Sequence, residues 1–145
     1  MLKLDNVSSS YGESRVIKNV SLEISSGKFF AILGKNGMGK TTLLKTIMGL
    51  MDKSEGEISL DETNLSKVST NLRAKFGLGY VPQGRGILPQ FTVQENMMIG
   101  SFARQKENTN DVNEDVEFVL KLFPILKDFQ KRRGGDLSGG QQQQL

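Results

Sequence analysis

Nine residues in the first third of the chain have the types and spacing of a phosphate-binding loop. Residues 34–42 contain the pattern G-x-x-x-x-G-K-[ST] in full, followed by a second threonine. Glycines within this loop can adopt positive φ angles and let the backbone approach a ligand closely. Successive N–H groups can therefore turn inward around a β-phosphate, as in other anion-binding nests of the backbone. The glycines concerned are Gly34, Gly37 and Gly39.

Three side chains at the end of this loop can act on the outer part of a polyphosphate. Lys40 supplies a compact positive charge to the β- and γ-phosphates. Thr41 has a hydroxyl that can coordinate Mg²⁺, and we expect Thr42 to donate to an outer phosphate oxygen. The alternative is a glycine-rich turn between a strand and a helix that binds no ligand. The order of strand, loop, Lys-Thr pair and helix favours the phosphate site.

Elements on both sides must position the loop. Residues 29–33 form an unbroken apolar run, which predicts a strand of a parallel sheet that is buried on both faces. After the loop, apolar residues recur at helical spacing. The loop therefore ends at a helix N-terminus, where free N–H groups and the helix dipole favour an anion. The apolar residues of this helix are Leu43, Leu44, Ile47 and Met48.

Alternating sequence predicts antiparallel strands elsewhere in the first half of the chain. We expect two or three strands within residues 2–24, with a turn at residues 8–12. A polar loop at residues 52–56 precedes a half-buried strand at residues 57–60. Asp61 and Glu62 then resemble the carboxylate pair that holds Mg²⁺ in many nucleotide hydrolases. The preceding strand alternates instead of being uniformly apolar, so we interpret this pair as a solvated turn.

The second half is predicted to be mainly helical. A short helix is expected at residues 70–76 and an apolar strand at residues 78–81, which Pro82 ends. Thr92 to Glu95 form a capping box that begins a helix. Residues 104–114 read as a polar surface connection, and an amphipathic helix follows that Pro124 ends. A further short helix is expected after Pro124.

Composition excludes several classes of protein. The 145 residues are 37% hydrophobic and 24% charged with a net charge of +3, which describes one globular domain with a mildly basic surface. The sequence contains no cysteine and no histidine, so disulfides and thiolate metal sites are excluded. No secretory signal is apparent, and the longest apolar run has five residues. Any association with a membrane is expected to go through a partner.

A second segment near the end of the sequence can also bind an anion. Residues 137–141 read Leu-Ser-Gly-Gly-Gln, and Ser138 to Gln141 form a capping box that opens a helix. The exposed N-terminus of that helix can donate to a phosphate. Considered alone, the segment is better interpreted as an ordinary capped helix that is followed by the glutamine tract at residues 141–144.

Taken together, the motifs resemble those of the nucleotide-binding subunit of ATP-binding cassette (ABC) transporters. Tyr11, the loop at 34–42, Gln83 and the segment at 137–141 occur in the order of that family. The resemblance implies an α/β fold with a P-loop NTPase core, an N-terminal antiparallel β subdomain and a helical signature subdomain. Residues 1–82 would form the β subdomain and the core, and residues 83–145 the helical part. The strand ending in Asp-Glu and the later histidine of the family are absent from these residues. We therefore expect the chain to be the N-terminal part of one nucleotide-binding domain.

The resemblance also assigns roles to residues. Tyr11 would stack on adenine with Val16 beside it, and Gln83 would approach Mg²⁺ and the attacking water. Lys40 and Gln83 would be catalytic, Thr41 and Gln83 would contact the metal, and the general base is absent from the chain. The cofactors implied are ATP and Mg²⁺. The residues expected to bind nucleotide are Tyr11, Val16, Gly34, Asn36, Gly37, Gly39, Lys40, Thr41, Thr42, Ser138, Gly139, Gly140 and Gln141.

Partners follow from the same resemblance. Two ATPase subunits, identical or similar, would clamp ATP between the loop of one and the signature segment of the other. They would bind transmembrane permease subunits at the cytoplasmic face of the membrane and serve a solute-binding protein indirectly. Residues 81–96 resemble importers of branched-chain amino acids and of urea, and residues 137–145 favour the urea type. Without the missing carboxylate we expect weak ATP binding and little or no hydrolysis by these residues alone.

Two other functions remain open from the sequence. One is a nucleotide-binding or dimerisation module that does not hydrolyse ATP. The other is a soluble ABC protein of translation or DNA repair, whose partner would be a nucleic acid. No long coiled coil or dense basic stripe interrupts the chain, so we expect no nucleic acid partner.

Overall fold

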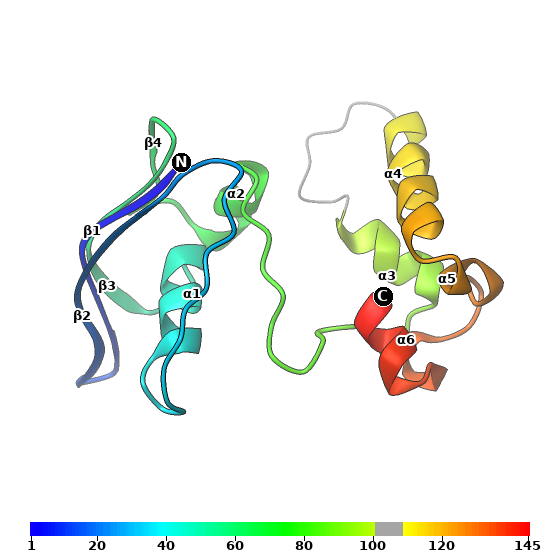
Figure 1. Ribbon diagram of the computed structural model, residues 1–145, viewed down its shortest axis with the longest axis horizontal. Coiled ribbons are helices and arrows are strands. Elements are labelled where there is room, and N and C mark those ends of the chain that lie inside the picture. Colours follow the sequence, from blue (N-terminus) through cyan, green and yellow to red (C-terminus); the bar gives the residue numbers. More distant parts are fainter. Residues whose placement is uncertain (101–108) are drawn as a thin grey trace. The chain divides into compact units, whose positions relative to one another are not determined.

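The computed structural model describes residues 1–100 and 109–145, which form two compact units, Met1–Leu78 and Gly79–Leu145 (Figure 1). The first unit contains a sheet and two helices. The second is built from helices and connecting loops. The predicted division of the domain after residue 82 stays a prediction.

The sheet of the first unit is antiparallel. Its strands are β1 (Leu2–Tyr11), β2 (Ser14–Ile24), β3 (Lys53–Leu60) and β4 (Thr63–Asn64), in the order β2-β1-β3-β4. β1 lies in the centre and pairs with both β2 and β3. Two or three antiparallel strands were expected before the loop, and the structure has two, which form one hairpin.

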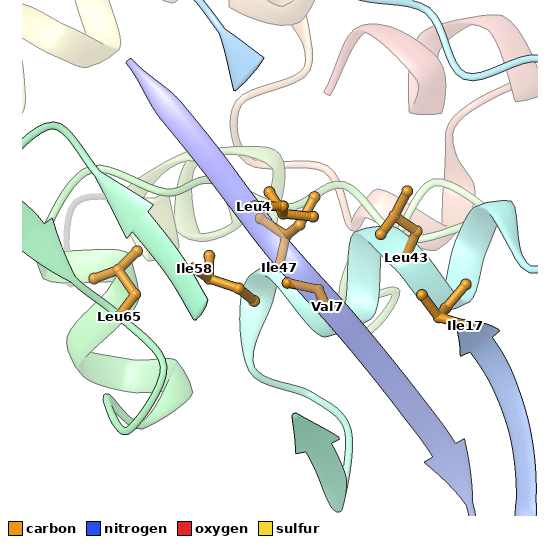
Figure 2. Packing of buried hydrophobic residues seen from close by; sticks show 7 residues of the cluster. All are labelled: Leu4, Val7, Ile17, Leu43, Ile47, Ile58 and Leu65. Carbon is orange, nitrogen blue, oxygen red and sulfur yellow. The ribbon is translucent and has the colours of Figure 1, made fainter. Parts of the chain in front are cut away.

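Apolar side chains of this sheet pack against helix α1 (Lys40–Met48), and helix α2 (Thr70–Lys75) follows β4. Because side chains alternate along a strand, every second residue of the paired strands can face the helix. Seven buried side chains form the core (Figure 2). They are Leu4, Val7, Ile17, Leu43, Ile47, Ile58 and Leu65. The core therefore fixes α1, and with it the end of the predicted phosphate loop, on the sheet.

Some predicted boundaries in the first unit are wrong. The turn expected at residues 8–12 is confined to its end, because Ser8 and Ser9 lie within β1 and are buried. The polar loop expected at residues 52–56 is largely strand, since β3 pairs with β1 from Lys53 onward. Leu44 is 44% exposed, so it does not belong to the buried face of α1. The solvated turn at Asp61 is confirmed, since its side chain is 75% exposed.

The predicted parallel strand at residues 29–33 and the predicted apolar strand at residues 78–81 do not form. Residues 29–33 and 78–81 lie outside the sheet, and no strand of the described residues pairs with them. Phe29 is 97% exposed and Leu33 90% exposed, whereas Ile32 packs against the core. A strand is defined by hydrogen bonds to a neighbour. An apolar run predicts only that a neighbour is needed, not that the described residues supply one.

The second unit consists of short helices around a small apolar cluster. They are α3 (Val93–Ile99), α4 (Thr109–Leu122), α5 (Ile125–Asp128), the 3₁₀ turn η2 (Gly134–Asp136) and α6 (Gly139–Gln144). Val93, Leu126 and Leu137 are buried at its centre. The amphipathic helix ending before Pro124 and the capping box at Thr92 are confirmed.

The predicted polar connection at residues 104–114 lies partly outside the described residues. Where it is described, it is wrong, because α4 already begins at Thr109. Across residues 1–100 and 109–145, none of the helices has the length and apolar character that crossing a bilayer requires.

Candidate functional site

The predicted phosphate loop leads directly into α1. Gly39 is the residue before the helix and has a φ of 85°, and Gly37 has a φ of 81°. Both values lie in the left-handed region that side-chain-bearing residues rarely adopt. Glycine carries no side chain to cap the helix, so the N–H groups of the first turn remain available to a ligand. Glycine therefore occupies these two positions of the loop, where the backbone is left-handed.

Gly39 also packs against β2, which holds the loop on the sheet. A Cβ atom at Gly39 would lie 2.9 Å from Cδ1 of Ile17 and 3.3 Å from Cγ1 of Val16. The turn of the β1–β2 hairpin and the loop before α1 lie at the same end of the first unit (Figure 1). Val16, which was expected to flank a bound base, is therefore next to the loop.

Lys40 is held across the loop. Its Nζ donates to the carbonyl oxygens of Gly34 at 2.8 Å and of Lys35 at 2.7 Å. These bonds keep a positive charge beside the backbone amides of the loop. A compact ammonium that is free to rotate can exchange carbonyl acceptors for phosphate oxygens. The loop can thus offer both amide donors and a cation to one anion.

The remaining predicted residues of the loop differ in exposure. Asn36 and Thr41 are exposed, so their polar groups can reach a ligand. Thr42 is only 8% exposed, and its carbonyl accepts from Thr46 Oγ1 at 2.7 Å. Tyr11 ends β1 just before the hairpin turn and is 47% exposed. Its role in stacking stays a prediction, as does donation by Thr42.

The other predicted residues lie in the second unit. Gln83 is exposed in a turn after Pro82. Ser138 caps α6, with its hydroxyl accepting from Gln141 N at 3.4 Å while Gln141 Oε1 accepts from Ser138 N at 2.9 Å. This confirms the capping box as a local structure. Gly139 and Gly140 are exposed on the first turn.

A buried arginine holds the far end of α1, and sequence reasoning missed it. Arg73 of α2 is 2% exposed, and its Nη1 donates to the carbonyls of Thr46 at 3.1 Å and Ile47 at 2.6 Å. Its Nε donates to Val68 O at 2.8 Å. Burial lowers the pKa of Arg73 below its ordinary value. The cation satisfies carbonyls at the C-terminus of α1, which complements the helix dipole.

Only tertiary structure reveals the contact between Arg73 and α1. The bonded residues are 26 and 27 positions apart, and nothing in the spacing of the sequence indicates the pairing. The left-handed cap at Gly49 fits the same contact, because a Cβ atom there would lie 2.8 Å from Nε of Arg73. A glycine at a helix C-terminus was therefore the only local signal.

The residues of the loop fit a nucleoside triphosphate with Mg²⁺. A Cβ atom at Gly37 would meet nothing within 4 Å, so the backbone at this point is open to a ligand. The described residues contain no cluster of carboxylates that could bind a metal alone. Within the loop, Thr41 has the exposed hydroxyl that could hold Mg²⁺ together with phosphate oxygens, which suits a cation that commonly shares its shell with phosphate.

Two curated relatives, both named as branched-chain amino acid transport ATP-binding proteins, are similar to the chain over its whole length. The chain is 35% identical to the high-affinity branched-chain amino acid transport ATP-binding protein BraG of Pseudomonas aeruginosa, over 100% of this chain and 61% of that protein. It is 34% identical to the probable branched-chain amino acid transport ATP-binding protein LivF of Archaeoglobus fulgidus, over 100% of this chain and 60% of that protein. The chain thus spans about three fifths of the length of these curated relatives.

Relatives named for other solutes match at similar identity. The Fe(3+) ions import ATP-binding protein FbpC of Fusobacterium nucleatum is 34% identical over 99% of this chain and 38% of its own length. The spermidine/putrescine import ATP-binding protein PotA of Haemophilus ducreyi is 36% identical over 100% of this chain and 38% of its own length. Identity at this level does not distinguish between solutes.

Solved structures agree with the fold. The ATP-binding cassette MJ0796, solved as a dimer in a post-hydrolysis state bound to ADP and Pi, matches with a TM-score of 0.82 and 32% identity. The match covers 99% of this chain and 66% of that one. The expected ABC ATPase fold class is confirmed. Residues 17–145 match the model of a family described as ABC transporter. The chain therefore belongs to the ABC transporter family.

Proposed function

We propose that the chain carries the ATP-binding loop and the signature segment of the ATPase subunit of an ABC importer. The observation that supports this most directly is the open loop at the N-terminus of α1, where Gly37 and Gly39 have left-handed φ angles and Lys40 spans the loop. The family membership then makes ATP the expected ligand. In this proposal the loop binds the β- and γ-phosphates.

Each group in the loop would have a distinct task. The amides of the first turn of α1 would donate to phosphate oxygens, and Lys40 would neutralise part of their charge. Thr41 would hold Mg²⁺, which supplies charge neutralisation for phosphoryl transfer when it is bound. Tyr11 and Val16 would contact the base. Gln83 would help to orient water and metal, since an amide can donate and accept without adding charge.

We further propose that a second subunit completes the site, with its segment from Ser138 to Gln141 contacting the γ-phosphate. The related cassette MJ0796, a dimer bound to ADP and Pi, supports this arrangement. Closure of two such subunits would drive transmembrane permease subunits at the cytoplasmic face of the membrane. A solute-binding protein would deliver the solute.

Because no Asp-Glu strand end follows the signature segment within the 145 residues, we propose that these residues alone hydrolyse little or no ATP.

The proposed solutes are branched-chain amino acids or urea. BraG and LivF are named for branched-chain amino acid transport, which supports the first of these. The preference for urea, taken from residues 137–145, stays a prediction that none of these relatives' names supports.

Transport in a defined system tests the proposal. The full-length protein should co-purify with membrane permease subunits. In proteoliposomes that contain both, leucine or urea should be transported only when ATP is present on the side of the membrane that the ATPase subunits face. Lys40→Ala should abolish uptake, and Lys35→Ala should serve as the matched control for loss of one positive charge. Co-purification with ribosomes or DNA instead of a permease would refute the importer proposal.

A further inference from the structure

Three consecutive residues after Gln83 have left-handed backbone angles. Gly84 has a φ of 90°, Arg85 a φ of 77° and Gly86 a φ of 75°. Glycine adopts such angles freely, but an arginine rarely does. A strained residue of this kind persists only where its surroundings over-determine it, and such residues cluster at functional sites. The contacts of Arg85 therefore indicate what the strain achieves.

The side chain of Arg85 reaches helix α6. Its Nη1 donates to Oε1 of Gln142 at 2.6 Å, although the two residues are 57 positions apart. Its guanidinium also lies against Gly139, where a Cβ atom would be 3.2 Å from Nη2. Glycine destabilises a helix interior relative to alanine. The closeness of Arg85 gives a physical reason for a residue without a side chain on this first turn.

Gln142 in turn ties α6 to the chain before it. Its Nε2 donates to the carbonyls of Gly134 at 3.2 Å and Leu137 at 3.1 Å. The amide of this residue thus uses its oxygen for Arg85 and its nitrogen for the segment that leads into α6. Together these bonds join the turn after Gln83, the segment before α6 and the first turn of that helix within one unit.

We propose that Arg85 is a positioning residue that fixes the first turn of α6 relative to the loop that contains Gln83. This inference rests on the proposed function, in which the first turn of α6 contacts the γ-phosphate bound by another subunit. Arg85 acts through Gln142 and the backbone at Gly139 and does not contact nucleotide itself. Its guanidinium reaches α6 from a residue whose φ angle is left-handed.

Two variants of Arg85 separate positioning from general stability. Arg85→Ala removes the side chain and keeps a strained backbone, whereas Arg85→Gly removes the side chain and relieves the strain. Lys131→Ala is the matched control, because it removes one exposed positive charge from the same unit. Each variant of the full-length protein is measured by amide hydrogen exchange at Gln142 and Leu145, whose N–H groups form bonds within α6.

We expect both Arg85 variants to raise exchange at these amides roughly tenfold, the factor that corresponds to one lost charge-assisted hydrogen bond. The melting temperature of Arg85→Gly should equal or exceed that of the parent, a result that a merely stabilising role would not give. ATP-dependent dimerisation should weaken by about the same factor. The affinity of the monomer for ATP should stay unchanged.

A double variant and the control variant show whether Arg85 acts through Gln142. Arg85→Ala combined with Gln142→Leu should exchange no faster than Gln142→Leu alone, because Gln142→Leu already removes the hydrogen bond from Arg85 together with the bonds to Gly134 and Leu137. Unchanged exchange in α6 after Arg85→Ala, or an equal rise after Lys131→Ala, would overturn the inference. Loss of dimerisation that is fully explained by weaker ATP binding to the monomer would overturn it too. Failure of the parent protein to bind ATP would instead refute the proposed function. Amide hydrogen exchange in α6 would still test the contact between Arg85 and Gln142.

Discussion

Replacing Arg73 with alanine should destabilise the first unit, because this one side chain satisfies carbonyls from two segments. The guanidinium donates to Val68, Thr46 and Ile47 and is almost completely buried. A hydrogen bond that involves a charged group contributes about 1.5–3 kcal/mol, and a cation at a helix C-terminus contributes up to about 2 kcal/mol.

These contributions are offset by the cost of burying the charge. Removing Arg73 recovers part of that desolvation cost, which the lowered pKa of the group also reflects. The Thr46 carbonyl also accepts from Gly49 N at 3.0 Å, so truncation deprives it of one of two donors. We therefore expect Arg73→Ala to lower the free energy of unfolding by about 2–4 kcal/mol. Arg73→Met fills the space but removes the guanidinium donors to Thr46, Ile47 and Val68, and should cost about 1–3 kcal/mol.

Urea unfolding followed by far-UV circular dichroism measures these differences. Lys75→Ala, at an exposed position of the same helix, is the control and should stay within about 0.5 kcal/mol of the parent. If Arg73→Met proves as stable as the parent, the desolvation cost equals the gain from the hydrogen bonds, and the reasoning about α1 is wrong.

Two further predictions concern helix starts. Gly39→Ala should cost about 1–2 kcal/mol for its left-handed backbone and about 1–3 kcal/mol more for the contact with Ile17, measured by urea unfolding. Gly37→Ala should show the backbone cost alone; equal losses in both variants would exclude the packing explanation. Hydrogen bonds from Thr92 lower the pKa of Glu95. Its stabilisation of α3 should therefore be complete above the ordinary glutamate pKa of about 4.3 and be lost as the pH falls below it, as amide exchange in α3 would report. In Glu95→Gln this pH dependence should disappear, and its persistence would implicate another group.

Local features of the site could be predicted from sequence because their partners are close in the chain. The capping boxes at Thr92 and Ser138 each join residues three positions apart, and both form as expected. The left-handed glycines before α1 are likewise dictated by a short pattern. Residue type and spacing suffice where the interaction spans one helical turn.

Features that depend on distant partners could not be predicted in this way. The apolar run at residues 29–33 indicates a strand, but a strand needs a neighbour that the described residues do not supply. The start of β3 follows from pairing Lys53 with Ser10, which no local pattern encodes. Arg73 and Arg85 both act on helices far away in the sequence. Their contacts emerge only when the chain is folded.

The central claim is that the loop before α1 binds the phosphates of ATP with the help of Lys40. Calorimetric titration of Mg-ATP into the full-length protein, Lys40→Ala and Lys35→Ala tests it most directly. We expect the parent and Lys35→Ala to bind alike, and Lys40→Ala to bind at least about tenfold more weakly, as loss of one charge-assisted contact requires. Equal binding by Lys40→Ala, or no binding by the parent, would contradict the claim.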